Sequence, residues 1–151
     1  MNGPCEATST PGATLLALAT TLASATDTSI ALIGPAGALN AVLLNDDNLP
    51  PPSGDAAVRF VNTSVDVPAF DVFVNFGKQV SSLAANTASG YVNLIAAVNT
   101  GSPYQFDFNI SGTSQAAVLS LPGVVLTAGH KYTIYLAGPA SALKGIVTQD
   151  N

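Results

Sequence analysis

Residues 104–111 read YQFDFNIS, and apolar and polar side chains alternate along them without a break. Successive side chains of a β-strand point to opposite faces, so this order gives one buried face and one solvated face. The segment therefore predicts a strand with one side in a hydrophobic core. That buried side is predicted to consist of Tyr104, Phe106, Phe108 and Ile110.

Short runs of the same kind flank this strand, and turn residues separate them at intervals of about 8–12 residues, which is typical of a β-sandwich. No segment combines the 3.6-residue period with the caps that a helix needs. The pattern predicts an all-β fold, an antiparallel β-sandwich. The expected strands are 57–62, 70–75, 90–97, 104–111, 116–121, 124–127, 131–137 and 143–148, with a hairpin turn over 75–78.

A proline-rich linker precedes these strands at residues 50–55, where three consecutive prolines are followed by Ser53 and Gly54. Proline fixes its φ angle and has no backbone N–H, so such a segment is extended and fairly stiff. We therefore expect a complete sandwich domain over residues 56–151 and a separate piece over residues 1–49.

An internal repeat connects the two ends of the chain. Residues 29–46 (SIALIGPAGALNAVLLND) resemble residues 133–150 (TIYLAGPASALKGIVTQD), and the shared Gly-Pro-Ala stands at 34–36 and again at 138–140. Because the second copy ends a sandwich, the first should be the same part of another sandwich. We expect residues 1–49 to be the C-terminal half of a β-sandwich repeat, with strands at about 13–22, 29–33 and 40–45.

Residues 13–25 (ATLLALATTLASA) allow two interpretations, the apolar core of a secretory signal or a strand of the folded protein. The signal interpretation lacks a basic leading region, because residues 1–12 contain Glu6 and no Lys or Arg. The repeat also aligns this run with residues 117–129, near the end of the chain. We therefore expect a strand.

Three separated motifs resemble one protein family. They are Val58-Arg59-Phe60-Val61-Asn62 followed by Ser64-Val65-Asp66-Val67-Pro68, then Asp71-Val72-Phe73-Val74-Asn75, then Ala128-Gly129-His130-Lys131-Tyr132-Thr133. In this order they resemble the bacterial and archaeal family known as domain of unknown function 4397. The resemblance implies an Ig-like β-sandwich on exported proteins, often in tandem and without established activity. It covers residues 56–151 as one unit and 13–48 as the second half of another.

The charge content restricts the class of partner. The chain has four Lys and Arg residues against nine Asp and Glu, and only 9% of its residues are charged. The four basic residues are scattered, so no basic face exists to neutralise phosphates, and nucleic acid is not expected as a partner. No apolar run reaches the roughly 18 residues of a membrane span, so no membrane insertion is expected.

Catalytic chemistry is not readable in this sequence. The one histidine, His130, lies in a turn without a nucleophile motif, and Asp66, Asp71 and Asp107 suit turn and strand-edge roles better than paired acid–base catalysis. Zinc needs several Cys or His ligands, and the chain has one of each. We expect no enzyme activity, no cofactor and no metal site.

A lone half-sandwich leaves strand edges and an apolar face uncovered. The cover is either a missing half from the same protein, a neighbouring copy, or the chain's own sandwich. We favour an extracellular or cell-surface structural or adhesive protein that binds other copies of itself, with a filament as one form of that assembly. The runner-up is a module that binds a polysaccharide or a cell-wall ligand as part of a longer tandem-repeat surface protein, with Tyr91, Tyr104 and Tyr135 as the candidates for stacking on a sugar. The assembly interface is predicted to be Leu15, Leu16, Leu18, Leu22, Ile30, Leu32, Val42 and Leu44.

Overall fold

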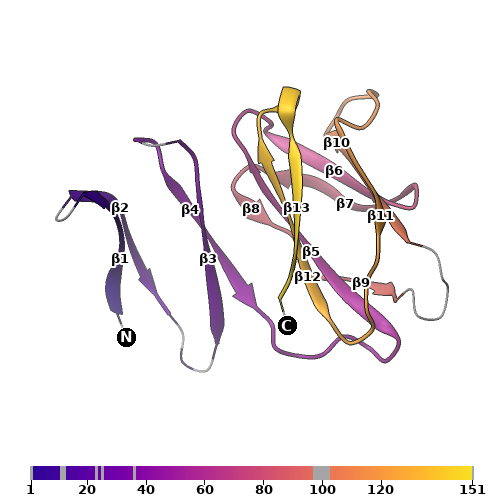
Figure 1. Cartoon of the computed structure of the whole chain (residues 1–151), viewed down its shortest axis with the longest axis horizontal. Coiled ribbons are helices and arrows are strands. Elements are labelled where there is room, and N and C mark those ends of the chain that lie inside the picture. The colour runs from indigo at the N-terminus through magenta and orange to yellow at the C-terminus, as the bar shows by residue number, and fades with distance from the viewer. Residues whose placement is uncertain are drawn as a thin grey trace. The chain divides into compact units, whose positions relative to one another are not determined.

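A computed structural model of the chain describes residues 2–10, 13–22, 24, 26–35, 37–96 and 103–150. The chain divides into two compact units, Met1–Leu49 and Pro50–Asn151 (Figure 1). Regular structure in the described residues is β-strand, apart from a 3₁₀ turn at Ala140–Ala142. The predicted all-β fold class is therefore confirmed. Residue 97 of the expected strand 90–97 and residue 36 of the repeat lie outside the described residues.

The second unit is a sandwich of two sheets. One sheet has the order β11-β10-β6-β7, and the other has the order β13-β12-β5-β8 with β9 also paired to β5. The strands are β5 (Asp55–Ser64), β6 (Ala69–Val74), β7 (Gly77–Ala84), β8 (Thr87–Ala88), β9 (Val92–Ile95), β10 (Tyr104–Ile110), β11 (Leu119–Val124), β12 (Lys131–Gly138) and β13 (Lys144–Gln149).

One pair of strands departs from the predicted antiparallel arrangement. Strand β12 runs parallel to β5, with Lys131 opposite Ala57 and Gly138 opposite Ser64. A parallel pair requires a long connection. Here the connection is most of the second unit, which passes to the other sheet and back twice, through β6–β7 and through β10–β11. The antiparallel prediction holds for the other ladders described and is wrong for this one.

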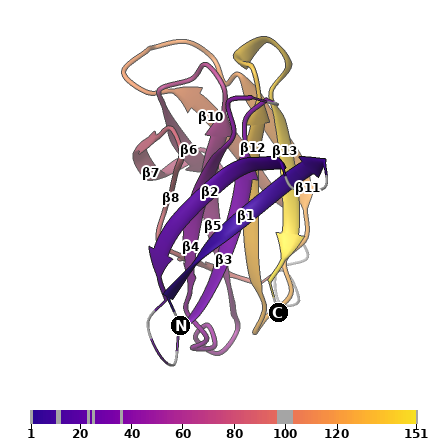
Figure 2. The ribbon, with the colours of Figure 1, turned by 90° about the vertical axis from the view of Figure 1, so that its left-hand side faces the viewer.

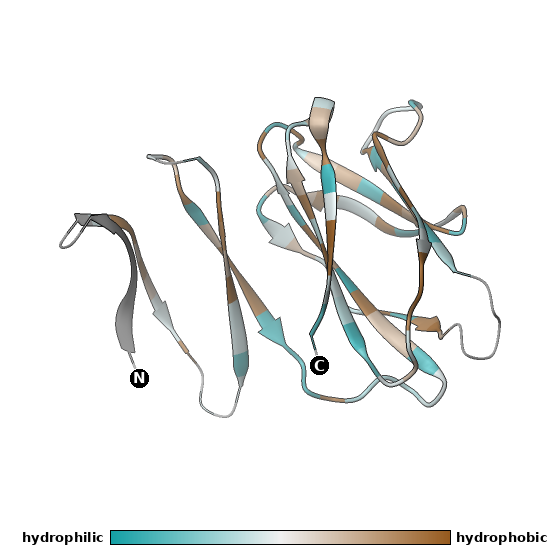
Figure 3. Ribbon diagram, in the orientation of Figure 1, coloured by the Kyte–Doolittle hydropathy of each residue, from teal (hydrophilic) through white to brown (hydrophobic). Residues whose placement is uncertain are grey.

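The core lies between the two sheets and follows the alternation in the sequence. Phe106 and Phe108 of β10 are fully buried, as predicted, and their rings lie 5.8 and 6.0 Å from the ring of Phe60 in β5. Tyr104 and Ile110 are partly buried against the same cluster. The bands of brown and teal along the strands in Figure 3 show this alternation of apolar and polar residues.

Side chains of the family motifs hold the turn between β5 and β6. Asn62 is fully buried; its amide donates to the carbonyl of Leu83 at 3.1 Å, and its Oδ1 accepts the N–H of Ser64 at 3.1 Å. Asp66 Oδ1 accepts the N–H of Ala140 at 2.8 Å and so ties this turn to the Gly-Pro-Ala turn after β12. These motif residues therefore satisfy buried polar groups of the backbone.

Two strand assignments from the sequence need correction. Strand β7 was not expected, because most of its side chains are polar and exposed and only Leu83 is buried. The runs 116–121 and 124–127 were expected as separate strands divided at Pro122, but one strand, β11, crosses this position. Strand β11 is at the edge of its sheet, where a residue without an N–H is tolerated.

The first unit consists of two separate hairpins. Strands β1 (Asn2–Thr10) and β2 (Ala13–Thr21) form one antiparallel pair, and β3 (Asp27–Ile33) and β4 (Asn40–Asp46) form the other. Figure 2 shows β1 and β2 side by side as one twisted ribbon. Strand β2 occupies most of the run with two interpretations, and β1 was not expected from the sequence.

Candidate functional site

Hairpins β3–β4 and β12–β13 share one strand register. Thr28 lies opposite Asn45, and Tyr132 lies opposite Gln149, so both members of the second pair stand 104 positions after the first. The shift is constant along both hairpins. The pairs from Thr28–Asn45 to Ile33–Asn40 recur as Tyr132–Gln149 to Ala137–Lys144.

The turns of the two hairpins also coincide. Gly34 has a φ of +100° and Gly138 a φ of +97°, a backbone conformation that residues with a Cβ rarely adopt. In each turn the alanine four positions after the glycine donates its N–H to the carbonyl of the proline that follows the glycine. These N–H···O distances are 3.0 Å for Ala38 to Pro35 and 2.9 Å for Ala142 to Pro139.

The hairpins differ in the strand on their far side. Strand β12 has β13 on one edge and β5 on the other, with eight residue pairs to β5. Strand β3 pairs with β4, and within the described residues no strand pairs with its second edge. Among the residues that the structure describes, the position that β5 fills beside β12 therefore has no counterpart strand beside β3.

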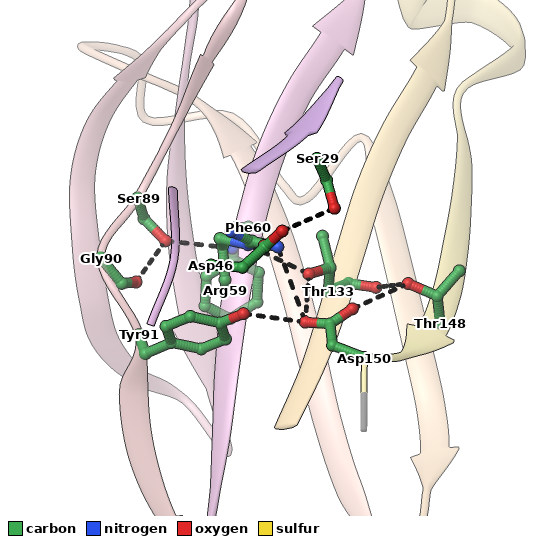
Figure 4. Close-up of polar contacts among 10 residues, drawn as sticks. All are labelled: Ser29, Asp46, Arg59, Phe60, Ser89, Gly90, Tyr91, Thr133, Thr148 and Asp150. Atoms are coloured by element: carbon green, nitrogen blue, oxygen red, sulfur yellow. Dashed lines mark hydrogen bonds and ion pairs between the residues drawn. The ribbon is translucent and has the colours of Figure 1, made fainter. Parts of the chain in front are cut away.

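Asp150 collects polar contacts that fasten β13 to β12 and β5 (Figure 4). Its Oδ2 accepts the Thr133 hydroxyl at 2.6 Å and the Tyr91 hydroxyl at 2.9 Å, and lies 3.7 Å from a guanidinium nitrogen of Arg59. Arg59 Nε in turn donates to Thr133 Oγ1 at 3.1 Å. The buried arginine thus has both a carboxylate and a hydroxyl partner, as a buried charge requires.

The Tyr91 ring has a cation against it from each of two strands. The guanidinium carbon of Arg59 lies 4.9 Å from the ring centre and Nζ of Lys131 lies 4.7 Å from it, within the range of cation–π attraction. Among the described residues no buried side-chain nitrogen or oxygen lacks a hydrogen-bond partner. We call this cluster the clamp, because it connects β5, β12 and β13; its members are Arg59, Tyr91, Lys131, Thr133 and Asp150.

Hairpin β3–β4 contains a counterpart of one hydrogen bond of the clamp. Ser29 donates to Asp46 Oδ2 at 2.6 Å, and these residues stand 104 positions before Thr133 and Asp150, whose bond has the same length (Figure 4). The repeat in sequence is therefore also a repeat in side-chain geometry.

The predicted interface residues divide into three groups by exposure. The two buried ones are on β4, and three others are exposed: Leu15 by 41%, Leu22 by 42% and Leu32 by 54%. The remainder are half-buried. Leu16, Leu18 and Ile30 form this half-buried group, and Val42 and Leu44 form the buried one.

The candidate acid–base residues each make contacts that support the fold. Asp71 accepts from Lys78 Nζ at 2.6 Å and from the Ser82 N–H at 2.9 Å, and these two bonds lower its pKa below the usual 3.8. Asp66 caps the Ala140 N–H, as described above. The imidazole Nδ1 of His130 lies 3.1 Å from the Gln149 amide nitrogen.

The described residues contain neither a cluster suited to a metal ion nor a helix suited to a membrane span. No three His, Cys, Asp or Glu side chains gather there as a metal ion would require. No helix in the same residues has the length and apolar character to cross a membrane.

The three tyrosines expected as a glycan platform occupy other roles. Tyr91 belongs to the clamp, and Tyr104 donates its hydroxyl to the carbonyl of Ile95 at 2.5 Å while packing against the core. Tyr135 is half-buried. The clamp itself was missed from the sequence; its one signal was Arg59, the basic residue inside a run of apolar positions.

The sequence of this chain matches the model of one protein family over part of its length. The model described as "Domain of unknown function (DUF4397)" matches residues 5–73, which confirms the resemblance inferred from the motifs. The matched range runs from β1 into β6 and includes hairpin β3–β4, so it does not coincide with the unit expected at 56–151. No curated protein matches the chain.

Proposed function

We propose that this relative of the DUF4397 family is a non-enzymatic structural or adhesive β-sandwich protein that associates with copies of itself. Residues 1–49 serve as a half-unit that adds strands to a neighbouring copy. The cell surface or the extracellular space is the proposed location, supported by the low charge content and by the exported character that the family resemblance implies.

The open edge of β3 is the observation that carries this proposal. Its repeat, β12, has a strand on both sides, whereas β3 has one on a single side within the described residues. An unpaired edge presents a row of N–H and C=O groups that can pair with another chain. Strand addition to such an edge is a common mode of recognition between proteins.

Pairing of β3 with β5 of another copy would not remove the unpaired edge from the assembly. If β3 of one copy took β5 of another, it would displace β12 from that β5. The displaced β12 would then be open in place of β3, whatever the number of copies. A self-complementary assembly must therefore use an edge that is open in the complete sandwich.

Most edges of the sandwich carry features that block pairing. Strand β7 has a non-glycine residue at positive φ, Ser82 at +52°, and its ladder with β6 contains register shifts. Strand β11 contains Pro122, and its ladder with β10 is also irregular. Strand β8 has only two residues. Bulges, proline and shortness all protect edges against association.

Strand β13 lacks these protections. It has six residues, its ladder with β12 contains no register shift, and Ile146 and Val147 are 51% and 40% exposed. Pairing of β3 from one copy with β13 of the next joins two different surfaces. Such a contact is heterologous, so it propagates into a filament or closes into a ring.

The experiment compares substitutions that add charge at matched exposed leucines. Leu32→Lys places an ammonium on β3, and Leu49→Lys places one in the linker, where the side chain is 72% exposed. Association is measured by light scattering behind size-exclusion chromatography and by negative-stain electron microscopy. Wild type and Leu49→Lys are expected to form polymers, and Leu32→Lys to remain monomeric.

Val147→Lys on β13 tests the other side of the contact. It should also give monomers, and an equimolar mixture with Leu32→Lys should cap at dimers, because each variant keeps one competent edge. Residues 50–151 alone, which contain the whole sandwich core, should not polymerise. A wild-type chain that stays monomeric at millimolar concentration contradicts the proposal.

A further inference from the structure

The turn between β6 and β7 holds a phenylalanine in an unusual place. Val74 pairs with Gly77, and the two residues between them, Asn75 and Phe76, have φ angles of +45° and +71°. Two positive φ angles define a type I′ hairpin turn, for which glycine is favoured at the second position. A bulky side chain at positive φ is an outlier.

Folding does not account for this phenylalanine. The Phe76 side chain is 80% exposed, so its ring contributes little to burial. Its backbone is also strained relative to glycine at the same place. A strained residue with an exposed aromatic ring directs attention to function.

The turn is fixed to the neighbouring strand, which holds the ring in place. The N–H of Asn75 donates to the carbonyl of Gln105 in β10 at 2.9 Å. The N–H of Gln105 donates back to Asn75 Oδ1 at the same distance. Phe76 is therefore presented by a turn that is bonded twice to the sheet.

A shallow hollow of about 290 Å³ lies beside this ring, on the face of the β11-β10-β6-β7 sheet that points away from the core. Its walls combine two aromatic rings with a carboxylate and an amide. The lining residues are Phe73, Phe76, Asp107, Asn109 and Ala117. Its volume is just below the roughly 300–1,000 Å³ of ligand pockets, so it suits one residue of a longer chain.

The polar groups of the hollow are oriented by their neighbours. Asp107 Oδ1 and Oδ2 accept from the Gln105 amide at 3.0 and 2.9 Å, and Oδ1 accepts the Ser120 hydroxyl at 2.5 Å. The Asn109 amide donates to the carbonyl of Gln115 at 3.0 Å. A carboxylate accepts about four hydrogen bonds and an amide has two N–H donors, so both retain capacity for a ligand.

We propose that this hollow binds a sugar residue of a neutral polysaccharide. The C–H face of a pyranose ring fits the negative face of the exposed Phe76 ring. Its hydroxyl groups donate to Asp107 and accept from Asn109. An apolar ligand would instead remove water from these two side chains without replacing the lost hydrogen bonds. This binding role is separate from self-association through β3.

The charges around the hollow select for a neutral sugar. Asp107 lines it, and the ammonium of Lys78, whose Nζ lies 5.4 Å from the Phe73 ring centre, is paired with Asp71 at 2.6 Å. The chain as a whole carries a net charge of −5. Uronic acids and sulfated sugars would therefore be repelled.

Affinity electrophoresis of the full chain through gels containing soluble neutral polysaccharides tests the proposal. The probes are β-1,3-glucan, β-1,4-glucan, xylan, mannan and starch, with alginate as the anionic control. All proteins compared carry Leu32→Lys as a background substitution, so that polymer formation does not affect mobility. At least one neutral probe is expected to retard the protein, and alginate is not.

Phe76→Gly is the decisive variant, because glycine relieves the turn while it removes the ring. It should unfold at a temperature equal to or above wild type and bind the retarding polysaccharide roughly two- to tenfold more weakly. Phe76→Tyr should bind normally, and so should Val65→Ala, which alters a 61% exposed side chain that does not line the hollow. Unchanged binding by Phe76→Gly, or no retardation by any neutral probe, overturns the proposal.

Discussion

Hairpins β3–β4 and β12–β13 are one structure in two environments. They share register, turn conformation and a 2.6 Å hydroxyl–carboxylate hydrogen bond. Yet Leu136 on β12 is fully buried, whereas Leu32, its counterpart on β3, is 54% exposed. The hairpin conformation therefore follows from the repeated local sequence, and burial follows from the neighbouring strands.

The comparison separates two sources of stability. Gly-Pro-Ala turns and regular cross-strand pairs are local, so both hairpins have them. The apolar burial that stabilises β12 comes from β5 and the facing sheet, which are distant in sequence. A two-stranded hairpin is at best marginally stable without such support.

The largest expected effect comes from truncating the paired leucines. Leu136→Ala should lower the unfolding free energy of residues 50–151 by about 2–5 kcal/mol, as for other buried leucines. Leu32→Ala should change stability by less than about 0.5 kcal/mol, because its side chain already contacts solvent. Urea denaturation followed by region-resolved hydrogen exchange measures both, and equal losses would remove the distinction drawn here.

Replacing the two turn glycines with alanine should instead affect the two hairpins alike. Gly34→Ala and Gly138→Ala each place a Cβ at strongly positive φ, which costs about 1–2 kcal/mol. In each turn the new Cβ would also crowd a backbone carbonyl oxygen, that of Ala38 at Gly34 and that of Ala142, 3.0 Å away, at Gly138. Hydrogen exchange of each hairpin should accelerate to a similar degree. An effect at one glycine only would mean that the turns are not equivalent.

The smallest expected effect is that of acid on the sandwich that contains hairpin β12–β13. The pKa of Asp71 is lowered by Lys78 and by the Ser82 N–H, so its charged form is favoured in the folded state. The resulting stability is complete above the unfolded pKa near 3.8 and is lost as pH falls through the lower folded value. Lys78 is 43% exposed, so the term is below about 1 kcal/mol.

Asp71→Asn is the variant that isolates this acid term. It should reduce the loss of stability as the pH falls below 3.8, where the carboxylate of Asp71 with its lowered pKa becomes protonated in wild type. Thermal unfolding of wild type and variant across that range measures it. An unchanged pH profile would show that the ion pair contributes nothing.

Parts of the fold were predictable because their pattern is local. The alternation around Phe106 and Phe108 specified both the strand and its buried face. Strand β7 was not predictable, since an edge strand with one buried side chain carries almost no alternation. The break expected at Pro122 failed for a related reason, because proline is allowed at an edge and the sequence does not state which strands are edges.

The candidate sites were predictable to different degrees. The repeat located hairpin β3–β4 and suggested an uncovered edge, but strand order decided which edge is open. The clamp joins Arg59, Tyr91 and Asp150, which are far apart in sequence and meet only through the sheet order. Residues 75–78 were expected as a turn, whereas the positive φ and exposure of Phe76 are properties of the backbone and could not be derived from composition.

The parallel pair β5–β12 has a consequence for the order of events during synthesis. Arg59 on β5 meets Thr133 on β12, 74 positions further along the chain. At about 5–20 residues per second, a ribosome needs roughly 4–15 s to make that interval. Throughout this delay β5, nine of whose ten residues are buried in the folded protein, has no permanent neighbour on one side. The nascent protein is therefore most vulnerable to misfolding and to chaperone capture before its last hairpin emerges.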